Sequence, residues 1–336
     1  MARIAINGLG RIGRATLKIV LDTPGLELVA INDLVPPDNL AYLLRFDTVY
    51  GRYNRSVKAE EAALVIDDQR YPVFSEKDPS QLPWRDMAVD IVLECTGVFR
   101  QREGLEKHLQ AGARRVMLSA PAKSDGIETI VHGVNQPAED CDMFSTASCT
   151  TNCITPVAEV MGRRVGVKKA IMTTVHAYTS SQAIVDGPSS KYRRGRAAAA
   201  NFVPTSTGAA IATTKVLPQF SGKFDGVAIR GPIPVGSICD MVFVTDRPTR
   251  VDEINDIFRS EADTDQYRGI LGCTEQPLVS SDIIQDPRAS IVDLTMTQVV
   301  DGDLVKIMAW YDNEWGYASQ MVKEAVRVSR QQPVTV

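Results

Sequence analysis

The sequence lacks the charge balance that would indicate a highly charged partner. Its 336 residues include 37 Lys and Arg against 41 Asp and Glu, which gives a formal net charge of −4. This balance provides no general attraction to nucleic acid or to an anionic membrane. No apolar run approaches the roughly 18 residues that would predict a membrane span. We therefore expect no nucleic-acid or membrane partner, and any anion site must be local.

Cysteine pairs with regular spacing are also missing. The six cysteines are Cys95, Cys141, Cys149, Cys153, Cys239 and Cys273. This distribution supports neither a disulfide framework nor a structural metal site, and it predicts free thiols in a reducing compartment. The stretch before Gly8 is too short for the apolar region of a signal peptide. We therefore expect a cytoplasmic protein.

The first half of the chain alternates strand-like and helix-like segments. Apolar strand-like runs lie at 2–7, 27–33, 90–97 and 114–121. A helical pattern at 13–22 separates the first two runs, and one at 104–113 separates the last two. This order predicts right-handed βαβ units and an α/β domain with a parallel sheet.

The second half changes character near Ser148, where we place a domain boundary. It contains a helix pattern at 251–262 among strand-like segments at 168–178, 224–234, 236–246, 289–303 and 303–313. The segments are joined partly by turns, which predicts an α+β domain with a largely antiparallel or mixed sheet and helices on one face. A last helical stretch, from about Trp315 to Arg330, is placed to return to the first domain.

A glycine-rich turn directly follows the first strand. Gly8, Gly10 and Gly13 have the G-x-G-x-x-G spacing and precede a helix pattern, as a dinucleotide-binding turn requires. Asp33 ends the second strand, where its carboxylate can bind the ribose hydroxyls of adenosine. Leu34 offers no charge to a 2′-phosphate, so we predict NAD over NADP. The alternative is an ordinary Gly-rich turn with a surface Asp.

Cys149 lies in the polar stretch STASCTTNCITP, residues 145–156, at the start of a predicted helix near Thr150. The unpaired N–H groups of a helix N-terminus favour a thiolate over a thiol, which predicts a nucleophile. Cys153 lies one turn further on, in a more apolar run, and is interpreted as a packing residue.

A cysteine nucleophile needs a base, and the chain has only three histidines. His108 lies among charges on a predicted helix and is interpreted as a surface residue. His132 has no polar cluster near it in the sequence. His176 ends a strand and precedes a polar loop, the place where catalytic groups tend to be presented. We therefore choose His176 as the base.

Several segments of the second half carry groups that bind anions. The cluster KYRRGR contains Lys191, Arg193, Arg194 and Arg196. PTSTGAA, residues 204–210, brings hydroxyls to a helix start, and Arg230 ends a strand. The arginines alternatively form a solvated surface or a subunit contact. Together with a thiolate and a dinucleotide domain, they predict oxidation of a phosphorylated aldehyde through a covalent thioester, released by water or phosphate.

The motifs ING-x-GRIGR, S-x-ASCTTNC, TTVHAYT, RRGRAAA, PTSTGAA and WYDNEWGY occur in this order. In them the chain resembles phosphorylating glyceraldehyde-3-phosphate dehydrogenases over nearly its whole length. The resemblance implies a homotetramer that acts on glyceraldehyde 3-phosphate and inorganic phosphate. It also implies an NAD-binding Rossmann domain of residues 1–148, completed by 315–336, and a catalytic domain of residues 149–314. A loop of residues 178–201 would reach a neighbouring subunit's cofactor.

The resemblance further assigns roles to matching positions. Cys149 would be the nucleophile and His176 the general base. The substrate phosphate would lie against Thr179 and Arg230. Inorganic phosphate would bind at Ser148, Thr150, Arg194, Thr207 and Gly208. The cofactor positions would be Asn7, Gly8, Gly10, Arg11, Ile12, Gly13, Asp33, Leu34, Thr96, Ser119, Pro188, Asn313 and Tyr317.

The sequence departs from the usual family pattern at several positions. Thr146 replaces an Asn, Ser181 an Asp that many members have, and Gly231 a Val. Gly231 is expected to loosen the strand that aims Arg230. Two alternatives remain open: the related erythrose-4-phosphate dehydrogenase, which releases an acid with water, and a family member that acts mainly through partners.

Overall fold

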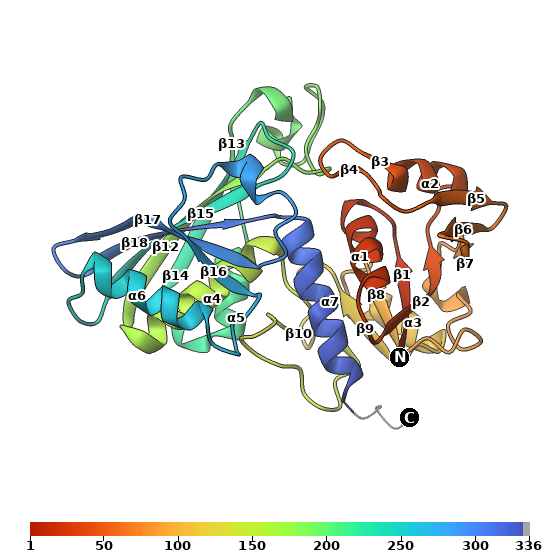
Figure 1. The fold of residues 1–336 in the computed structure, drawn as a ribbon, viewed down its shortest axis with the longest axis horizontal. Helices are drawn as coiled ribbons and strands as arrows, with labels where there is room; N and C mark the ends of the chain where they lie inside the picture. Colours follow the sequence, from red (N-terminus) through yellow and green to blue (C-terminus); the bar gives the residue numbers. More distant parts are fainter. Residues whose placement is uncertain (332–336) are drawn as a thin grey trace. The chain divides into compact units, whose positions relative to one another are not determined.

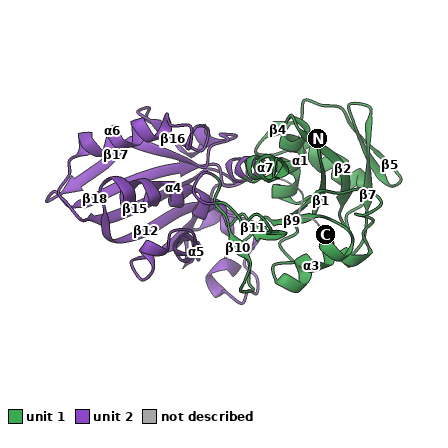
Figure 2. Cartoon of the chain, turned by 90° about the horizontal axis from the view of Figure 1, so that it is seen from below, with its two compact units in different colours: residues 1–132, 136–147, 321–336 green, residues 133–135, 148–320 purple. Residues whose placement is uncertain are grey.

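A computed structural model describes residues 1–331 and divides them into two compact units (Figure 2). Unit 1 comprises Met1–His132, Gln136–Ala147 and the chain from Met321 onward. Unit 2 comprises Gly133–Asn135 and Ser148–Gln320. Unit 1 thus takes up the last helix six residues later than the expected Trp315. Within residues 1–331, every helix is too short or too polar to cross a membrane.

Unit 1 is built on a sheet of nine strands in the described residues, in the order β10-β11-β9-β8-β1-β2-β7-β6-β5. Neighbours from β10 to β7 run parallel, and β7, β6 and β5 form an antiparallel edge. The strands are β1 (Ala2–Asn7), β2 (Leu26–Asn32), β5 (Val57–Glu60), β6 (Ala63–Ile66), β7 (Gln69–Phe74), β8 (Ile91–Glu94), β9 (Arg115–Leu118), β10 (Glu128–Thr129) and β11 (Met143–Ser145), and β3 (Phe46–Asp47) pairs separately with β4 (Gly51–Arg52).

Strand β1 lies between β2 and β8, so the direction of strand addition reverses beside it. In parallel α/β sheets ligands bind at the carboxyl ends of the strands at such a reversal. The sheet confirms the predicted parallel Rossmann-type architecture. Apolar side chains of its central strands, including Ile4, Ile6 and Leu93, are fully buried. The helices of this unit are α1 (Arg11–Leu21), α2 (Pro37–Arg45), α3 (Arg102–Gln110) and the later part of α7 (Trp315–Ser329).

Unit 2 contains a mixed sheet in the order β13-β14-β12-β15-β18-β17-β16 (Figure 1). The β12–β14 and β16–β17 pairs are parallel, and the other pairs are antiparallel. This confirms the expected mixed sheet. Its strands are β12 (Val167–Ala177), β13 (Val203–Ser206), β14 (Phe224–Gly231), β15 (Ser237–Thr245), β16 (Leu271–Thr274), β17 (Ser290–Val300) and β18 (Leu304–Tyr311).

Three helices cover one face of this sheet: α4 (Cys149–Arg164), α5 (Ala209–Val216) and α6 (Val251–Ala262) (Figure 1). The strands alternate accordingly. On β15, Cys239, Met241 and Phe243 are fully buried, and the residues between them are partly exposed. Strand periodicity therefore directs one row of side chains toward the helices and the other toward the opposite face.

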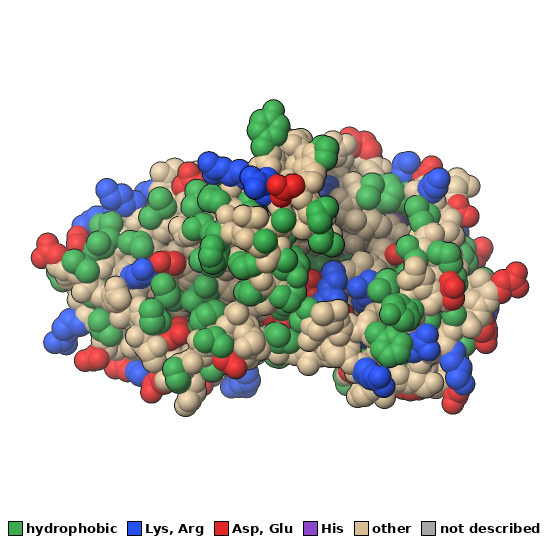
Figure 3. Space-filling view, turned by 90° about the horizontal axis from the view of Figure 1, so that it is seen from above, with side chains coloured by type: hydrophobic (Ala, Val, Ile, Leu, Met, Phe, Trp, Pro, Cys, Tyr) green, Lys and Arg blue, Asp and Glu red, His purple; other side chains and the backbone are tan. Residues whose placement is uncertain are grey.

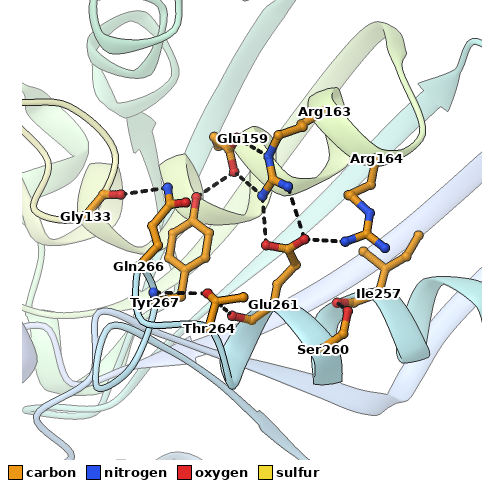
Figure 4. Close-up of polar contacts among 10 residues, drawn as sticks. All are labelled: Gly133, Glu159, Arg163, Arg164, Ile257, Ser260, Glu261, Thr264, Gln266 and Tyr267. Carbon is orange, nitrogen blue, oxygen red and sulfur yellow. Dashed lines mark hydrogen bonds and ion pairs between the residues drawn. The ribbon is translucent and has the colours of Figure 1, made fainter.

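Charged side chains fix the later turns of α4 against α6 (Figure 4). Arg163 donates to both Glu159 and Glu261, and Arg164 pairs with Glu261 at 2.5 Å. Tyr267 donates to Glu159 at 2.6 Å. Because Glu261 is almost fully buried, these bonds replace the water that its carboxylate loses. They hold the helix that begins at Cys149.

Candidate active site

Helix α4 begins with its own cap. Ser148 has an extended backbone, and its Oγ accepts a hydrogen bond at 3.2 Å from the backbone N–H of Thr151. A serine N-cap satisfies one of the helix's unpaired donors. Cys149 is therefore the first helical residue, one position earlier than expected. Cys153 is fully buried with its Sγ 3.6 Å from Ser290 Oγ, as a packing residue would be.

His176 lies at the end of β12 and faces this helix start. Its Nε2 is 3.3 Å from Cys149 Sγ, and its Nδ1 is 2.7 Å from the carbonyl oxygen of Ala177. A carbonyl only accepts, so a proton on Nδ1 would donate to Ala177. In that tautomer Nε2 carries no proton and faces the thiol. The structure thus brings together the two residues that the sequence selected separately.

Loss of water dominates the pKa of both groups: His176 is buried, and Cys149 lies in the protein interior with part of its surface still accessible. Desolvation raises the pKa of the Cys149 thiol to about 11, against the weaker opposing effects of Arg230 and of hydrogen bonds from Thr150. Desolvation, together with the charge of Arg230, lowers the pKa of His176 to about 3. The backbone N–H of Thr150 at the helix start lowers the thiol pKa, as expected, but the loss of water outweighs this effect.

Arg230 is held beside His176 by strand pairing. The parallel register of β12 and β14 places the two residues opposite each other. Arg230 Nη1 donates to the Ala177 carbonyl at 2.9 Å and lies 2.5 Å from His176 Nδ1. Because a guanidinium only donates, a bond from Nη1 to Nδ1 would select the other tautomer, with the proton on Nε2. A role of His176 as base therefore requires Nη1 to bond Ala177 and not Nδ1. Its Nε is buried without a hydrogen-bond partner among the described residues. Arg230 therefore has donor capacity to spare at the site.

Tyr311 is a member of this site that the sequence did not single out. Its hydroxyl lies 2.9 Å from both Thr150 Oγ1 and Thr174 Oγ1, and its ring stands edge-on to His176. All three hydroxyl side chains are buried. The Thr150 hydroxyl is thus engaged inside the unit. A buried tyrosine in a strand is indistinguishable from core in a sequence, so no local signal marks it.

A second cluster joins the polar loop to β13. Arg194 Nε donates to Thr205 Oγ1 at 3.0 Å, and Thr179 Oγ1 lies 2.8 Å from Ser181 Oγ. Arg194 Nη1 is 3.5 Å from the same Ser181 Oγ. Ser181 therefore supplies a hydroxyl between Thr179 and Arg194.

Two cations of this site lack a carboxylate partner among residues 1–331. Burial lowers the pKa of both Arg194 and Arg230, and no carboxylate acts on either. Arg196, in contrast, pairs with Asp186 at 2.7 Å on the surface. Lys191 reaches Ser206 Oγ at 3.3 Å. Within the KYRRGR cluster, Arg194 thus lies in the site without an ion-pair partner among residues 1–331, whereas Arg196 belongs to a surface ion pair.

The remaining predicted phosphate residues lie at the start of α5. Gly208 is the N-cap residue and provides no side-chain cap, and Thr207 Oγ1 accepts from the backbone N–H of Ala209 at 3.2 Å. This bond occupies the first N–H of the helix, and the following N–H groups of the first turn remain as donors for an anion. Gly231 is the last residue of β14, in register with Ala177, so the strand remains paired at Arg230.

In unit 1, the glycine turn is shaped for close backbone approach. A Cβ on Gly13 would collide with the Gly8 carbonyl, and one on Gly8 would lie 2.9 Å from Thr96. A Cβ on Gly10 would meet no atom within 4 Å. Gly10 is also the N-cap of α1 and makes no side-chain cap. The turn therefore combines two tightly packed glycines with an open, uncapped helix start suited to a pyrophosphate.

The other predicted cofactor residues of unit 1 surround this turn. Asp33 accepts from Leu9 N at 2.6 Å, and Leu34 is exposed. Arg11 pairs with Asp47 at 2.5 Å. Four further positions differ in exposure: Ile12, Thr96 and Ser119 are half-buried, and Asn7 is buried.

Three predicted cofactor residues belong to unit 2. Asn313 is buried, and its Oδ1 accepts from Gly236 N at 3.1 Å and from Ser237 Oγ at 2.9 Å. This fixes the side chain and leaves Nδ2 as its remaining donor group. Tyr317 is buried, and Pro188 is exposed in the loop of residues 178–201.

Two histidines outside the site differ from expectation. His108 is fully buried, not on the surface, with Nδ1 accepting from Trp84 Nε1 at 3.0 Å. Leu105 and His108, three residues apart on α3, both face the core, a spacing that marks the buried side of a helix. His132 does have a polar partner: its Nδ1 lies 2.8 Å from Glu324 Oε2.

Comparisons with known proteins cover almost the whole chain. The family "Glyceraldehyde 3-phosphate dehydrogenase, NAD binding domain" matches residues 2–102, and the family "Glyceraldehyde 3-phosphate dehydrogenase, C-terminal domain" matches residues 148–313. The chain is 45% identical over 332 residues to a glyceraldehyde-3-phosphate dehydrogenase of Zymomonas mobilis, covering 98% of each chain. It is 46% identical over 333 residues to one from Streptomyces coelicolor, covering 98% of this chain and 99% of the relative.

Proposed function

Because the chain belongs to the glyceraldehyde 3-phosphate dehydrogenase family, we propose that it oxidises glyceraldehyde 3-phosphate to 1,3-bisphosphoglycerate with NAD and inorganic phosphate. The observation that carries this proposal is the 3.3 Å approach of Cys149 Sγ to His176 Nε2 beside two arginines without carboxylate partners. A thiol with a base supports covalent catalysis. Cations without partners support a phosphorylated substrate.

The first step joins the thiol to the aldehyde. Sγ of Cys149 attacks the aldehyde carbon as its proton passes to Nε2 of His176. The carbonyl oxygen then takes a proton and becomes the hydroxyl of a hemithioacetal. Direct transfer suits this pair, because burial disfavours a lone thiolate or a lone imidazolium more strongly than it disfavours two opposite charges in contact. Arg230 and Thr179 would hold the substrate phosphate.

The second step oxidises the hemithioacetal to a thioester. His176 removes the hydroxyl proton as hydride leaves the carbon. NAD, when bound, supplies the hydride acceptor. The glycine turn, the uncapped start of α1 and the Asp33 carboxylate fit its pyrophosphate and ribose. Asn313, anchored through Oδ1, would use Nδ2 on the carboxamide of the nicotinamide.

The third step transfers the acyl group to phosphate. An oxygen of inorganic phosphate attacks the thioester carbon and the C–S bond breaks. The leaving sulfur takes the proton that His176 removed in the second step, which regenerates the thiol. Arg194 and the start of α5, with Thr207 and Gly208, would bind this phosphate. Ser148 and Thr150 would line it at the start of α4. Their hydroxyls already contact Thr151 and Tyr311, so their contribution would need these bonds to rearrange.

We also propose that copies of the chain associate into a homotetramer. The face of the unit 2 sheet opposite its helices carries apolar side chains that remain exposed (Figure 3). On this face Ile171 is 61% and Val227 52% exposed, beside Val175 on β12. The loop of residues 178–201 adds Ile184 and Tyr192, which are 83% and 89% exposed. Contiguous exposed apolar surface of this kind marks an interaction site.

A cytoplasmic location completes the proposal. The six cysteines of the described chain are all free thiols, and Cys149 has to be reduced to act. Persistent free thiols fit a reducing compartment.

One assay matrix tests the proposed reaction. Purified protein is given glyceraldehyde 3-phosphate or erythrose 4-phosphate, with NAD or NADP, with and without inorganic phosphate, and NAD(P)H formation is recorded. We expect the highest kcat/KM with glyceraldehyde 3-phosphate, NAD and phosphate. A rate that is indifferent to phosphate and higher with erythrose 4-phosphate would assign the chain to the rival reaction. The elution volume of the same sample reports the oligomeric state.

A further inference from the structure

A chain of buried polar side chains crosses the carboxyl ends of three neighbouring strands in unit 1. Asn7 ends β1, Asn32 ends β2 and Glu94 ends β8, and each is at most 4% exposed. The residues that follow them directly lead into the proposed cofactor positions Gly8, Asp33 and Thr96. The network therefore lies immediately behind the loops that would hold the cofactor.

Glu94 is the acceptor at the centre of this network. Its Oε2 accepts from Asn7 Nδ2 at 2.5 Å and lies 3.1 Å from His108 Nε2. Its Oε1 accepts from the backbone N–H of Thr96 at 2.8 Å and from the Thr96 hydroxyl. A carboxylate that accepts from four donors is well satisfied without water. Two of these donors belong to a cofactor loop.

The partner on the far side of Glu94 fixes the orientation of the whole network. Trp84 Nε1 donates to His108 Nδ1 at 3.0 Å, so Nδ1 carries no proton and the proton of a neutral ring lies on Nε2. That proton points at Glu94 Oε2. Trp84 and His108 are both completely buried, and their rings are stacked at 6.3 Å. The tautomer of His108 is thereby set by an indole that can only donate.

The network continues to the second strand. Asn32 Nδ2 donates to Asn7 Oδ1 at 2.7 Å and to the carbonyl of Glu76 at 3.0 Å. Glu76 N returns a bond to Asn32 Oδ1 at 2.9 Å. Since the Asn7 amide donates to Glu94 and accepts from Asn32, its two ends are not interchangeable. One carboxylate thus specifies the side-chain orientation across three strands.

The loops themselves are connected to this network. Gly8 packs so closely against Thr96 that a Cβ would lie 2.9 Å from its backbone. Thr96 Oγ1 also accepts from Val98 N at 3.0 Å, and Leu9 N donates to Asp33 at 2.6 Å. A shift of Thr96 would therefore move the wall against which the glycine turn is packed.

We propose that Glu94 is a positioning residue for NAD: oriented by His108, it holds the three cofactor loops in their binding geometry through Thr96, through Asn7 and, by way of Asn7, through Asn32. This inference rests on the proposed cofactor site. A buried carboxylate is a costly way to stabilise a sheet, since an apolar side chain of similar volume often does as well. Two of its four donors instead lie in the Thr96 loop and a third, Asn7, directly precedes the glycine turn, where a fixed geometry lowers the entropy lost on binding.

The substitution Glu94→Gln tests this proposal in the full chain. The glutamine keeps an acceptor for Thr96 but places an N–H₂ group against the donors of Asn7 and His108. We expect the Kd for NAD, measured by calorimetry, to rise about tenfold, the factor that 1.4 kcal/mol produces. The Kd for ADP-ribose, which lacks the nicotinamide, should rise by the same factor. Turnover at saturating NAD should be retained.

Glu324→Gln is the matched control. Glu324 is also a buried carboxylate of unit 1, 1% exposed and 2.8 Å from a histidine, His132, but it lies on α7. It should lower the melting temperature without changing the Kd for NAD. If Glu94→Gln is destabilised to the same degree and binds NAD like the wild type, the role is structural and the proposal is wrong. Wild-type protein that fails to bind NAD would instead contradict the proposed function.

A second pair of variants applies even where Glu94→Gln does not fold. His108→Leu removes the donor to Glu94, whereas His108→Gln can place an amide N–H close to the position of Nε2. We expect His108→Leu to weaken NAD binding and His108→Gln to restore most of it. Equal affinities for both variants and the wild type would overturn the proposal.

Discussion

Cys149 Sγ lies 3.3 Å from His176 Nε2. The two residues belong to two separate elements: Cys149 is at the start of α4 and His176 is near the end of β12. Both groups are desolvated, which raises the pKa of the thiol to about 11 and lowers that of the imidazole to about 3. Near neutral pH the free chain therefore favours the uncharged thiol and imidazole. In the proposed mechanism, reactivity depends on proton transfer between them.

Replacing His176 with Asn removes the acceptor for the thiol proton. The thiolate fraction then rises only as the pH approaches the raised pKa of Cys149, so the rate of alkylation by iodoacetamide should fall at pH 7. The pH profile of the alkylation rate should move to higher pH. Turnover should fall by about 10²- to 10⁴-fold, the usual contribution of a general base. His132→Asn, in unit 1, is the control and should leave the alkylation profile and the turnover unchanged. An unchanged alkylation profile in His176→Asn would contradict the assignment.

Replacing Arg194 with Gln removes a cation that has no carboxylate partner in the described chain. We expect KM for inorganic phosphate to rise about tenfold or more, as loss of a charge-assisted bond implies. NADH formation in the absence of phosphate should be little affected. Arg196→Gln removes an equal charge from a surface ion pair with Asp186 and should not change KM. Similar KM values in the two variants would place the phosphate elsewhere.

Two glycines of unit 2 should respond in opposite ways to alanine. A Cβ on Gly231 has no atom nearer than 3.8 Å, so Gly231→Ala should stabilise the protein by about 0.4–1 kcal/mol through the unfolded state. Gly236 has a φ of +92°, and its Cβ would collide with Ser280 O. Gly236→Ala should destabilise by more than about 1 kcal/mol. Urea unfolding measures both, and the same sign for both would be inconsistent with this backbone.

The cluster of Figure 4 predicts an acid-sensitive contribution to stability. The hydrogen bond from Arg163, with help from Arg164, lowers the pKa of Glu261 despite burial. A lowered pKa gives stability that is present above the unfolded value of 4.5 and is lost as pH falls through the folded value.

Glu261→Gln should therefore cost about 1–3 kcal/mol at pH 7 and flatten the decline in the free energy of unfolding below about pH 5. Glu275→Gln, at an exposed ion pair with Arg259, is the control and should leave that decline unchanged. A wild-type slope in Glu261→Gln would contradict the assignment.

The long alternating segments of the fold could be predicted from the sequence. Strands β1, β2, β8 and β9 are apolar runs beside the helix patterns of α1 and α3, and each signal is local. The antiparallel edge β5–β7 was not predicted. On β5, three of four residues are exposed, and its pairing is fixed by contacts with β6 and β7, not by an internal period.

The candidate site divides in the same way. Cys149 and His176 stand out because their neighbours are polar and their residue types are reactive. Tyr311 does not stand out, since its contact with Thr150 and Thr174 depends on the pairing of β18 with β15 and of β15 with β12. Glu94 and His108 were equally hidden, in an apolar strand and on a charged helix. Nor does the sequence show the degree of desolvation that sets the thiol pKa.

The central claim is that Cys149 carries the acyl group until phosphate removes it. Stopped-flow measurement of NADH after mixing the protein with NAD and glyceraldehyde 3-phosphate, without phosphate, tests this directly. We predict a burst of one NADH per chain, followed by rapid turnover once inorganic phosphate is added, and no burst in Cys149→Ser. Steady turnover without phosphate, or a burst that survives in Cys149→Ser, would contradict the account.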